Sequence, residues 1–193
     1  MASLVLKMSV SLDGYVASVD GSADWKAAGR SHDSTSWVLE TISNARAHLV
    51  GASTYAEWAD YWPDASGPFA KAMNEIPKVV FSSSLTSAEW GETEIAAGDL
   101  TEAITRLKRE RPDGYVLAQG GARFARSLVQ TGLIDEYRLV VHPVVLGAGV
   151  RLFSAPHTIE SHNTTAFSSG AVAHVFAARA VGRPLGHVLM LHA

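Results

Sequence analysis

The stretch from Tyr115 to Phe153 restricts the possible folds more than any other part of the chain. It opens with Tyr115 to Gln119, an apolar run of strand length that ends at the pair Gly120-Gly121. The apolar residues of the next segment recur with helical spacing and end at a glycine: Phe124, Leu128, Val129 and Gly132. The pattern predicts a strand, a tight glycine turn and a helix that covers one face of a sheet.

The glycine pair lies where a backbone can approach a ligand closely. Glycine tolerates left-handed backbone and carries no side chain. The helix that begins at Ala122 and Arg123 offers free N–H groups and the positive end of its dipole. A phosphate group is therefore the expected ligand. A turn that needs positive φ and binds nothing explains the pair equally well when it is taken alone.

The same stretch resembles the C-terminal signature of the RibD type of reductase domain from riboflavin biosynthesis, a branch of the dihydrofolate reductase fold. The matching runs are Gly120-Gly121, GLIDE from Gly132 to Glu136, and PVVLGAG from Pro143 to Gly149. The resemblance covers roughly residues 3 to 178. It implies that the glycine pair, with Ala122 and Arg123 beside it, contacts the pyrophosphate of NADPH.

Three further apolar runs also end in glycine or hydroxyl residues. These runs and the residues after them are Leu4 to Val10 with Ser11 to Gly14, Ala47 to Val50 with Gly51, Ser53 and Thr54, and Lys78 to Phe81 with Ser82 and Ser83. In parallel α/β sheets ligands bind outside the carboxyl ends of the strands. We therefore expect these residues to meet at one edge of the sheet. Turn formation and helix capping are the alternative explanation for each.

The resemblance assigns these strand ends to the two ligands of a reductase. It places the loop with Asp13 and Gly14 beside the nicotinamide and the substrate. It implies cofactor contacts for Gly51, Ser53 and Thr54, and places Ser82 and Ser83 beside the ribose 2′-phosphate, which favours NADP over NAD. Ala52 stands where this family commonly has arginine, so one cationic contact to the cofactor is missing.

Three carboxylates are candidates for ordering the water that supplies a proton: Asp13, Asp24 and Glu40. Asp13 also suits a polar turn, and Glu40 also suits the solvated side of a helix predicted over residues 34–46 with Ser34 or Ser36 as its cap. The residues do not decide among the three. No convincing set of basic residues accompanies the predicted pocket, so a pterin or flavin-like substrate is at least as well supported as a ribose phosphate.

Composition and motifs exclude several classes of protein. A net charge of −3 without a Lys/Arg cluster argues against nucleic-acid binding, and the absence of cysteine excludes disulfides and thiolate metal sites. No Rossmann fingerprint, P-loop or hydrolase nucleophile motif is present, and no histidine spacing indicates a metal. No signal peptide or apolar run of membrane-spanning length is found, which predicts a cytoplasmic protein.

The alternation of strand and helix patterns predicts an α/β fold of the dihydrofolate reductase type, with three α/β/α layers. The central sheet is expected to be mostly parallel and to end in an antiparallel hairpin from Thr164 to Arg179. One domain is expected over residues 1–180, followed by a tail over 181–193. Family habit and the apolar hairpin also predict a homodimer.

The predicted function is that of an NADPH-dependent reductase. It would transfer a hydride to a C=N or C=O carbon of a small heterocycle, namely a pterin, a flavin-like ring or a 5-amino-6-(5-phosphoribosylamino)uracil-type compound. The alternative is a non-catalytic nucleotide-binding protein of the same fold, which Ala52 in place of arginine keeps open.

Overall fold

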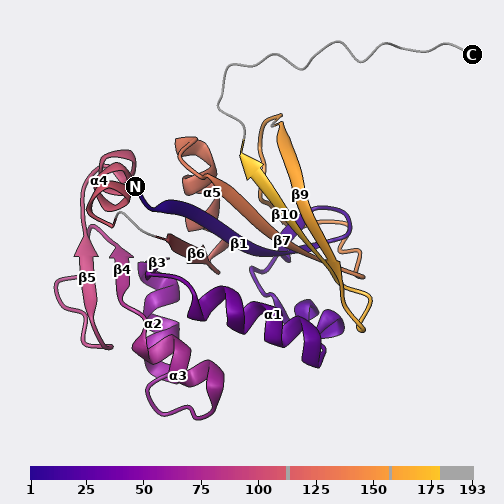
Figure 1. The fold of residues 1–193 in the computed structure, drawn as a ribbon, viewed down its shortest axis with the longest axis horizontal. Helices are drawn as coiled ribbons and strands as arrows, with labels where there is room; N and C mark the ends of the chain where they lie inside the picture. The colour runs from indigo at the N-terminus through magenta and orange to yellow at the C-terminus, as the bar shows by residue number, and fades with distance from the viewer. Residues whose placement is uncertain (112–113, 157, 179–193) are drawn as a thin grey trace, which may run out of the picture.

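The computed structural model describes residues 1–111, 114–156 and 158–178. In these residues eight strands form one sheet in the order β5-β4-β3-β6-β1-β7-β10-β9, with helices on both faces (Figure 1). The strands are β1 (Ser3–Ser11), β3 (Ala47–Gly51), β4 (Lys78–Phe81), β5 (Thr93–Ala96), β6 (Tyr115–Gln119), β7 (Glu136–His142), β9 (Ile159–Ala166) and β10 (Val172–Ala178). Two short strands, β2 (Tyr15–Ala17) and β8 (Val150–Arg151), pair separately.

Helices connect the parallel strands. They are the 3₁₀ helix η1 (Asp24–Gly29) and the α-helices α1 (His32–Ser43), α2 (Ala52–Tyr61), α3 (Pro68–Glu75), α4 (Leu100–Glu110) and α5 (Ala122–Thr131). All pairings from β5 to β7 are parallel, whereas β10 runs antiparallel to both β7 and β9. The predicted α/β fold with a mostly parallel sheet and an antiparallel C-terminal hairpin is therefore confirmed.

Strand β1 is central because it is apolar on both faces. Leu4, Leu6 and Met8 pack on the side of α4 and α5, and Val5 packs on the side of α1, α2 and α3. In Figure 1, α1 crosses in front of the sheet and α5 lies behind it. Alternate residues of one strand thus enter two separate cores, as expected for a parallel strand covered on both faces.

Helix α1 differs from its predicted range at both ends. It begins at His32 and ends at Ser43, and its N-cap is Ser31, which forms a capping box with Ser34. The prediction that Ser34 or Ser36 caps this helix is wrong, because Ser34 already lies in the first turn. The Ser34 hydroxyl accepts a hydrogen bond from the Ser31 backbone N–H instead.

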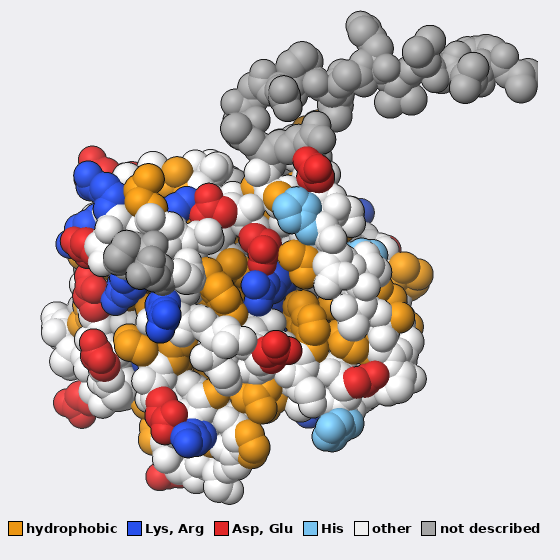
Figure 2. Space-filling model, in the orientation of Figure 1, with side chains coloured by type: hydrophobic (Ala, Val, Ile, Leu, Met, Phe, Trp, Pro, Cys, Tyr) orange, Lys and Arg blue, Asp and Glu red, His pale blue; other side chains and the backbone are white. Residues whose placement is uncertain are grey.

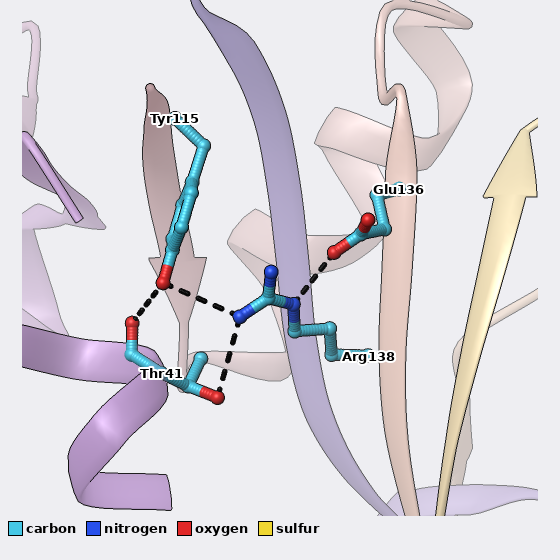
Figure 3. A network of polar contacts seen from close by, with 4 residues as sticks. All are labelled: Thr41, Tyr115, Glu136 and Arg138. Carbon is cyan, nitrogen blue, oxygen red and sulfur yellow. Dashed lines mark hydrogen bonds and ion pairs between the residues drawn. The ribbon is translucent and has the colours of Figure 1, made fainter. Parts of the chain in front are cut away.

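A network of polar contacts ties the C-terminal half of α1 to the sheet (Figure 3). The Arg138 guanidinium on β7 donates to the Glu136 carboxylate over 2.6 Å, to the Tyr115 hydroxyl over 3.3 Å and to the Thr41 hydroxyl over 3.4 Å. The Tyr115 hydroxyl in turn donates to the Thr41 carbonyl oxygen. These contacts fix α1 against β6 and β7, so its first turn is held over the carboxyl ends of the strands.

Charged side chains of both signs are interspersed over the face of the molecule that Figure 2 shows. Apolar side chains are visible between them, so this face presents no extended field of one sign. Among the described residues, no helix is both long and apolar enough to cross a bilayer. The predicted tail, residues 181–193, and the predicted end of the hairpin, Arg179, lie outside the described residues.

Candidate functional site

Three adjoining cavities lie along the carboxyl ends of β1, β6 and β7. The first, of about 630 Å³, is lined by Thr54, Gly120, Gly121 and Ala122 on one side and by η1 on the other, and is called here the helix-terminus cavity. The second, of about 510 Å³, is lined by Lys7, Lys26, Arg30 and His142 and is called the basic cavity. A third of about 220 Å³ connects them, and Lys26 lines all three.

A further cavity of about 650 Å³ lies between α1 and α3, where Leu39, Arg46 and Lys71 line it. It is slightly larger than the others, but it touches none of the predicted site residues. Ligands of this class of sheet bind at the carboxyl ends of the strands. The three adjoining cavities are therefore the candidate site.

Two helices begin side by side at the helix-terminus cavity. Strands β3 and β6 are neighbours in the sheet, with Leu49 opposite Ala118; β3 continues directly into α2, and β6 leads into α5 through Gly120 and Gly121. The N-caps of these helices are Gly51 for α2 and Gly121 for α5, and neither helix is capped by a side chain. The first N–H groups of both helices therefore remain available to an anion.

The two glycines of β6–α5 permit this close approach. Gly120 and Gly121 have φ angles of 71° and 65°, which disfavour any other residue. A Cβ atom on Gly121 would lie 2.6 Å from the Thr54 hydroxyl, and one on Gly120 would lie 3.1 Å from the Trp58 ring. The structure thus brings Thr54, Gly120, Gly121 and Ala122 together in the wall of one cavity, with Gly51 beside them as the N-cap of α2, and the binding of a phosphate there stays a prediction.

Other predicted cofactor residues do not line the three cavities. Ser53 and Arg123 are exposed in the first turns of α2 and α5. The Ser82 hydroxyl accepts hydrogen bonds from the backbone N–H groups of Ser84 and Leu85, beside the exposed Ser83. Gly14 adopts a φ of 90° in the turn after β1. Their assignment to the cofactor stays a prediction.

The three candidate carboxylates are not brought together. Asp13 accepts hydrogen bonds from the Ser11 hydroxyl (2.6 Å) and from the backbone N–H groups of Gly147 (2.7 Å) and Leu146 (3.1 Å). The Ser11 hydroxyl and these N–H groups lower the pKa of Asp13 to about 2, so its carboxylate fastens a loop. Glu40 is exposed on α1. Of the three candidates, Asp24 is the one that lines the helix-terminus cavity.

The expectation of no basic set near the pocket is wrong. Lys7 from β1 and Lys26 and Arg30 from the η1 region line the basic cavity together. Burial, and to a smaller extent Lys26, lowers the pKa of the Lys7 ammonium to about 8. The one signal in the sequence was a lysine inside the apolar run of β1, and its meaning depended on what packs beside it.

His142, at the end of β7, is the other residue that the sequence did not single out. Its side chain is 6% exposed, and neither ring nitrogen has a hydrogen-bond partner in the described part of the chain. Burial and, to a smaller extent, the nearby cations Lys7 and Lys26 together lower the pKa of His142 to about 4. The Trp25 ring of η1 packs edge-on against it with ring centroids 5.5 Å apart.

Replacing Gly29 with alanine is expected to destabilise the protein by about 1–3 kcal/mol, because overpacking a tight contact has that cost. A Cβ atom at Gly29 would collide with the His142 ring, which the sheet holds in place. Denaturant unfolding of the variant measures the change. Ala28→Ser, at the exposed neighbouring position, is the control. Equal stability of both variants with the parent would show that η1 does not pack on β7 as described.

The sheet order, the antiparallel hairpin and the cleft at the carboxyl edge define a protein of the dihydrofolate reductase-like fold. The match to the RibD C-terminal domain covers residues 2–173, so the chain belongs to that family. It is 30% identical to an uncharacterized protein, YyaP of Bacillus subtilis (strain 168), over 90% of this chain and 93% of that protein.

Two solved structures have the same fold. A putative riboflavin biosynthesis protein from Shewanella sp. PV-4 matches with a TM-score of 0.72 and 21% identity, over 93% of this chain and 99% of that chain. A diaminohydroxyphosphoribosylaminopyrimidine deaminase/5-amino-6-(5-phosphoribosylamino)uracil reductase from Thermotoga maritima matches with a TM-score of 0.66 and 20% identity, over 92% of this chain and 57% of that chain. The chain therefore spans little more than half of the Thermotoga protein.

Proposed function

We propose that the protein is an NADPH-dependent reductase that transfers a hydride to a C=N or C=O carbon of a small planar heterocycle. The observation that carries the proposal is the pair of uncapped helix N-termini at the helix-terminus cavity. Membership of the RibD C-terminal domain family supports oxidoreductase activity. The Thermotoga neighbour, described as a deaminase and 5-amino-6-(5-phosphoribosylamino)uracil reductase, supports the same reaction class by its fold.

The residues at this cavity fit a dinucleotide pyrophosphate. The first N–H groups of α2 and α5 would bind its oxygens, and Thr54 lies within reach of Gly121 at the same point. Lys26 and Arg30 line the opposite wall and would attract the negative charge, but Asp24 and Glu57 line the same cavity and offset them, and Ala52 supplies no cation. Bound there, the cofactor would supply the hydride from its nicotinamide ring.

Lys7 is a stronger candidate for the proton donor than Asp13 or Glu40. It lines both the basic and the connecting cavity, whereas Asp13 and Glu40 line neither. A lysine whose pKa is lowered to about 8 gives up a proton near neutral pH more readily than an ordinary lysine does. Asp24, which lines the helix-terminus cavity, remains the candidate among the three carboxylates.

A non-catalytic nucleotide-binding protein is the second candidate. The observation in its favour is Ala52, which leaves the first turn of α2 without a cation. Such a protein would bind NADPH in the same cavity and would not oxidise it in the presence of pterins, flavin-like rings or pyrimidines.

Titration of the purified protein with NADPH and, separately, with NADH tests the proposal. Micromolar binding of NADPH, followed by nucleotide fluorescence, is the expected result. Oxidation of bound NADPH on addition of one member of a heterocycle panel would distinguish the enzyme from the non-catalytic alternative. Failure of both nucleotides to bind would refute both.

The predicted homodimer and cytoplasmic location are part of the same proposal. Within the described residues strand β9 lies at the edge of the eight-stranded sheet, and most of its side chains are exposed, so it is the candidate surface for pairing between two copies. Light scattering of the purified protein measures the assembly directly, and a monomer mass would contradict the dimer.

A further inference from the structure

The basic cavity gathers positive charge without a carboxylate. Lys7, Lys26 and Arg30 line it, and no Asp or Glu stands among its described lining residues. The Lys7 ammonium makes no ion pair and no hydrogen bond within residues 1–111, 114–156 and 158–178. Clustered cations in a partly enclosed space repel one another, and an anion in the cavity would relieve that repulsion.

His142 adds unused hydrogen-bonding capacity to the same cavity. It lines the cavity, is more than nine-tenths buried, and leaves both ring nitrogens without a partner in the described part of the chain. Because Nδ1 of this ring lies against Gly29, Nε2 is the nitrogen left for a ligand, and buried polar groups usually have partners. An anion beside it would favour the protonated ring, whereas burial and, to a smaller extent, Lys7 and Lys26 lower the pKa of His142 and favour the neutral ring.

Aromatic side chains also line the basic cavity. Tyr61, Trp62 and Phe69 line it, and the rings of Trp62 and Phe69 are stacked with centroids 6.5 Å apart and an angle of 19° between their planes. Flat apolar walls of this kind suit a planar ring. The cavity therefore offers a surface for a ring next to a cluster of cations.

The first turn of α1 is not open to a phosphate, although Ser34 and Thr35 line the cavity. The Asp33 carboxylate already accepts hydrogen bonds from the Ser34 backbone N–H (2.9 Å) and from the Ser168 N–H (2.8 Å) and hydroxyl (2.9 Å) of the hairpin turn. A protein carboxylate thus occupies the helix terminus that would otherwise favour a doubly charged anion, and it repels one nearby.

We propose that the basic cavity binds a carboxylate group carried by a planar ring, with Lys7, Lys26 and His142 as its partners. This inference rests on the proposed function, in which the ring is the hydride acceptor, and it narrows the substrate to aromatic or heteroaromatic acids. The substrate inferred here therefore differs from a phosphoribosyl compound, which the fold neighbour from Thermotoga is described as reducing.

Three matched probes test the proposal on the nucleotide-free protein: naphthalene-2-carboxylate, the neutral naphthalene-2-carboxamide and 2-naphthyl phosphate. Calorimetric titration at low salt and pH 7 should show the carboxylate binding at least about tenfold more tightly than the amide. A hydrogen bond to a charged group contributes enough free energy for a difference in affinity of that size. It should also bind more tightly than the phosphate. Added salt should weaken the binding of the carboxylate.

The variant Lys7→Met should remove most of the advantage of the carboxylate over the amide. Lys26→Gln is the second variant. Because Lys26 lies on η1 and not in a strand, this replacement disturbs the sheet less than Lys7→Met does, and it should also reduce the advantage of the carboxylate. The matched control is Lys71→Met, which removes an exposed lysine that lies outside the three cavities. Its affinity for the carboxylate should equal that of the parent protein.

Several results would overturn the proposal: equal affinity for acid and amide, no binding of any probe, tighter binding of the phosphate, or an equal loss in the control. A separate titration with NADPH keeps the two hypotheses apart. A protein that binds the carboxylate and not NADPH retains this site and loses the reductase assignment. A protein that binds NADPH and not the carboxylate retains the reductase assignment and rejects the acidic substrate.

Discussion

Replacing Gly121 with valine is expected to weaken NADPH binding by at least about 100-fold, since it removes several hydrogen bonds to a charged phosphate. The new Cβ would lie 2.6 Å from the Thr54 hydroxyl and would project between the N-termini of α2 and α5. Fluorescence titration with NADPH measures the affinity, and circular dichroism shows whether the variant is folded.

Gly98→Val is the matched control for that experiment. Gly98 has a φ of 91°, so the substitution imposes similar backbone strain, but its Cβ would meet nothing within 4 Å. Gly98→Val should lose about 1–2 kcal/mol of stability, the usual cost of left-handed backbone for a residue with a side chain, and Gly121→Val should lose more because its Cβ also crowds Thr54. Only Gly121→Val should lose the nucleotide. Normal NADPH affinity in Gly121→Val would place the cofactor elsewhere and remove the main support for the proposed function.

Lowering the pH from 7 to 5 is expected to reduce the free energy of unfolding by about 4 kcal/mol through two buried histidines. Burial lowers the pKa of His48 to about 3, with a smaller contribution from Lys78, and burial also lowers the pKa of His142 to about 4. The unfolded chain takes up protons below about pH 6.5. The contribution of the two neutral histidines to the free energy of unfolding is therefore fully present above that pH and is lost as the pH falls toward 4.

Urea unfolding at pH 7 and pH 5 measures this effect. The double variant His48→Leu/His142→Leu should lose most of the pH dependence, whereas His162→Leu, on exposed β9, should keep it. The carboxylates with lowered pKa values, such as Asp13, stabilise the protein fully above about pH 4 and lose that effect only as the pH falls below it, so they do not change stability much between pH 7 and pH 5. A double variant as acid-sensitive as the parent would contradict the assignment.

The fold could be predicted well because its signals are local. At the start of α4 the Asp99 side chain accepts a hydrogen bond from the backbone N–H of Glu102, three residues further on, so neighbouring residues define where this helix begins. The strand, glycine and helix at Gly120-Gly121 also follow from neighbouring residues, as does the left-handed Gly132 that ends α5. Caps, turns and apolar spacing act over a few residues, so sequence patterns reveal them.

The basic cavity could not be predicted, because its residues are distant in the sequence. Lys7, Lys26 and His142 come from β1, η1 and β7, and only the parallel pairing of β1 with β7 brings the first and last together. Asp13 shows the same difficulty. Its spacing suited a catalytic acid or a local turn, but its carboxylate binds backbone groups at Leu146 and Gly147, more than a hundred residues away.

Lys26 borders all three cavities, so whatever occupies one of them changes the electrostatic potential in the others. An ammonium that is neutralised by an anion on one side attracts a second anion on the other side less strongly. Thermodynamic linkage makes this effect mutual: the factor by which the first ligand changes the affinity of the second equals the factor in the reverse direction. The oxidised nicotinamide ring is positively charged and the reduced ring is uncharged, so the two forms of the cofactor would change the affinity for an acidic ligand by different factors. Equilibrium titrations with each pair of ligands would show which pair binds together most tightly.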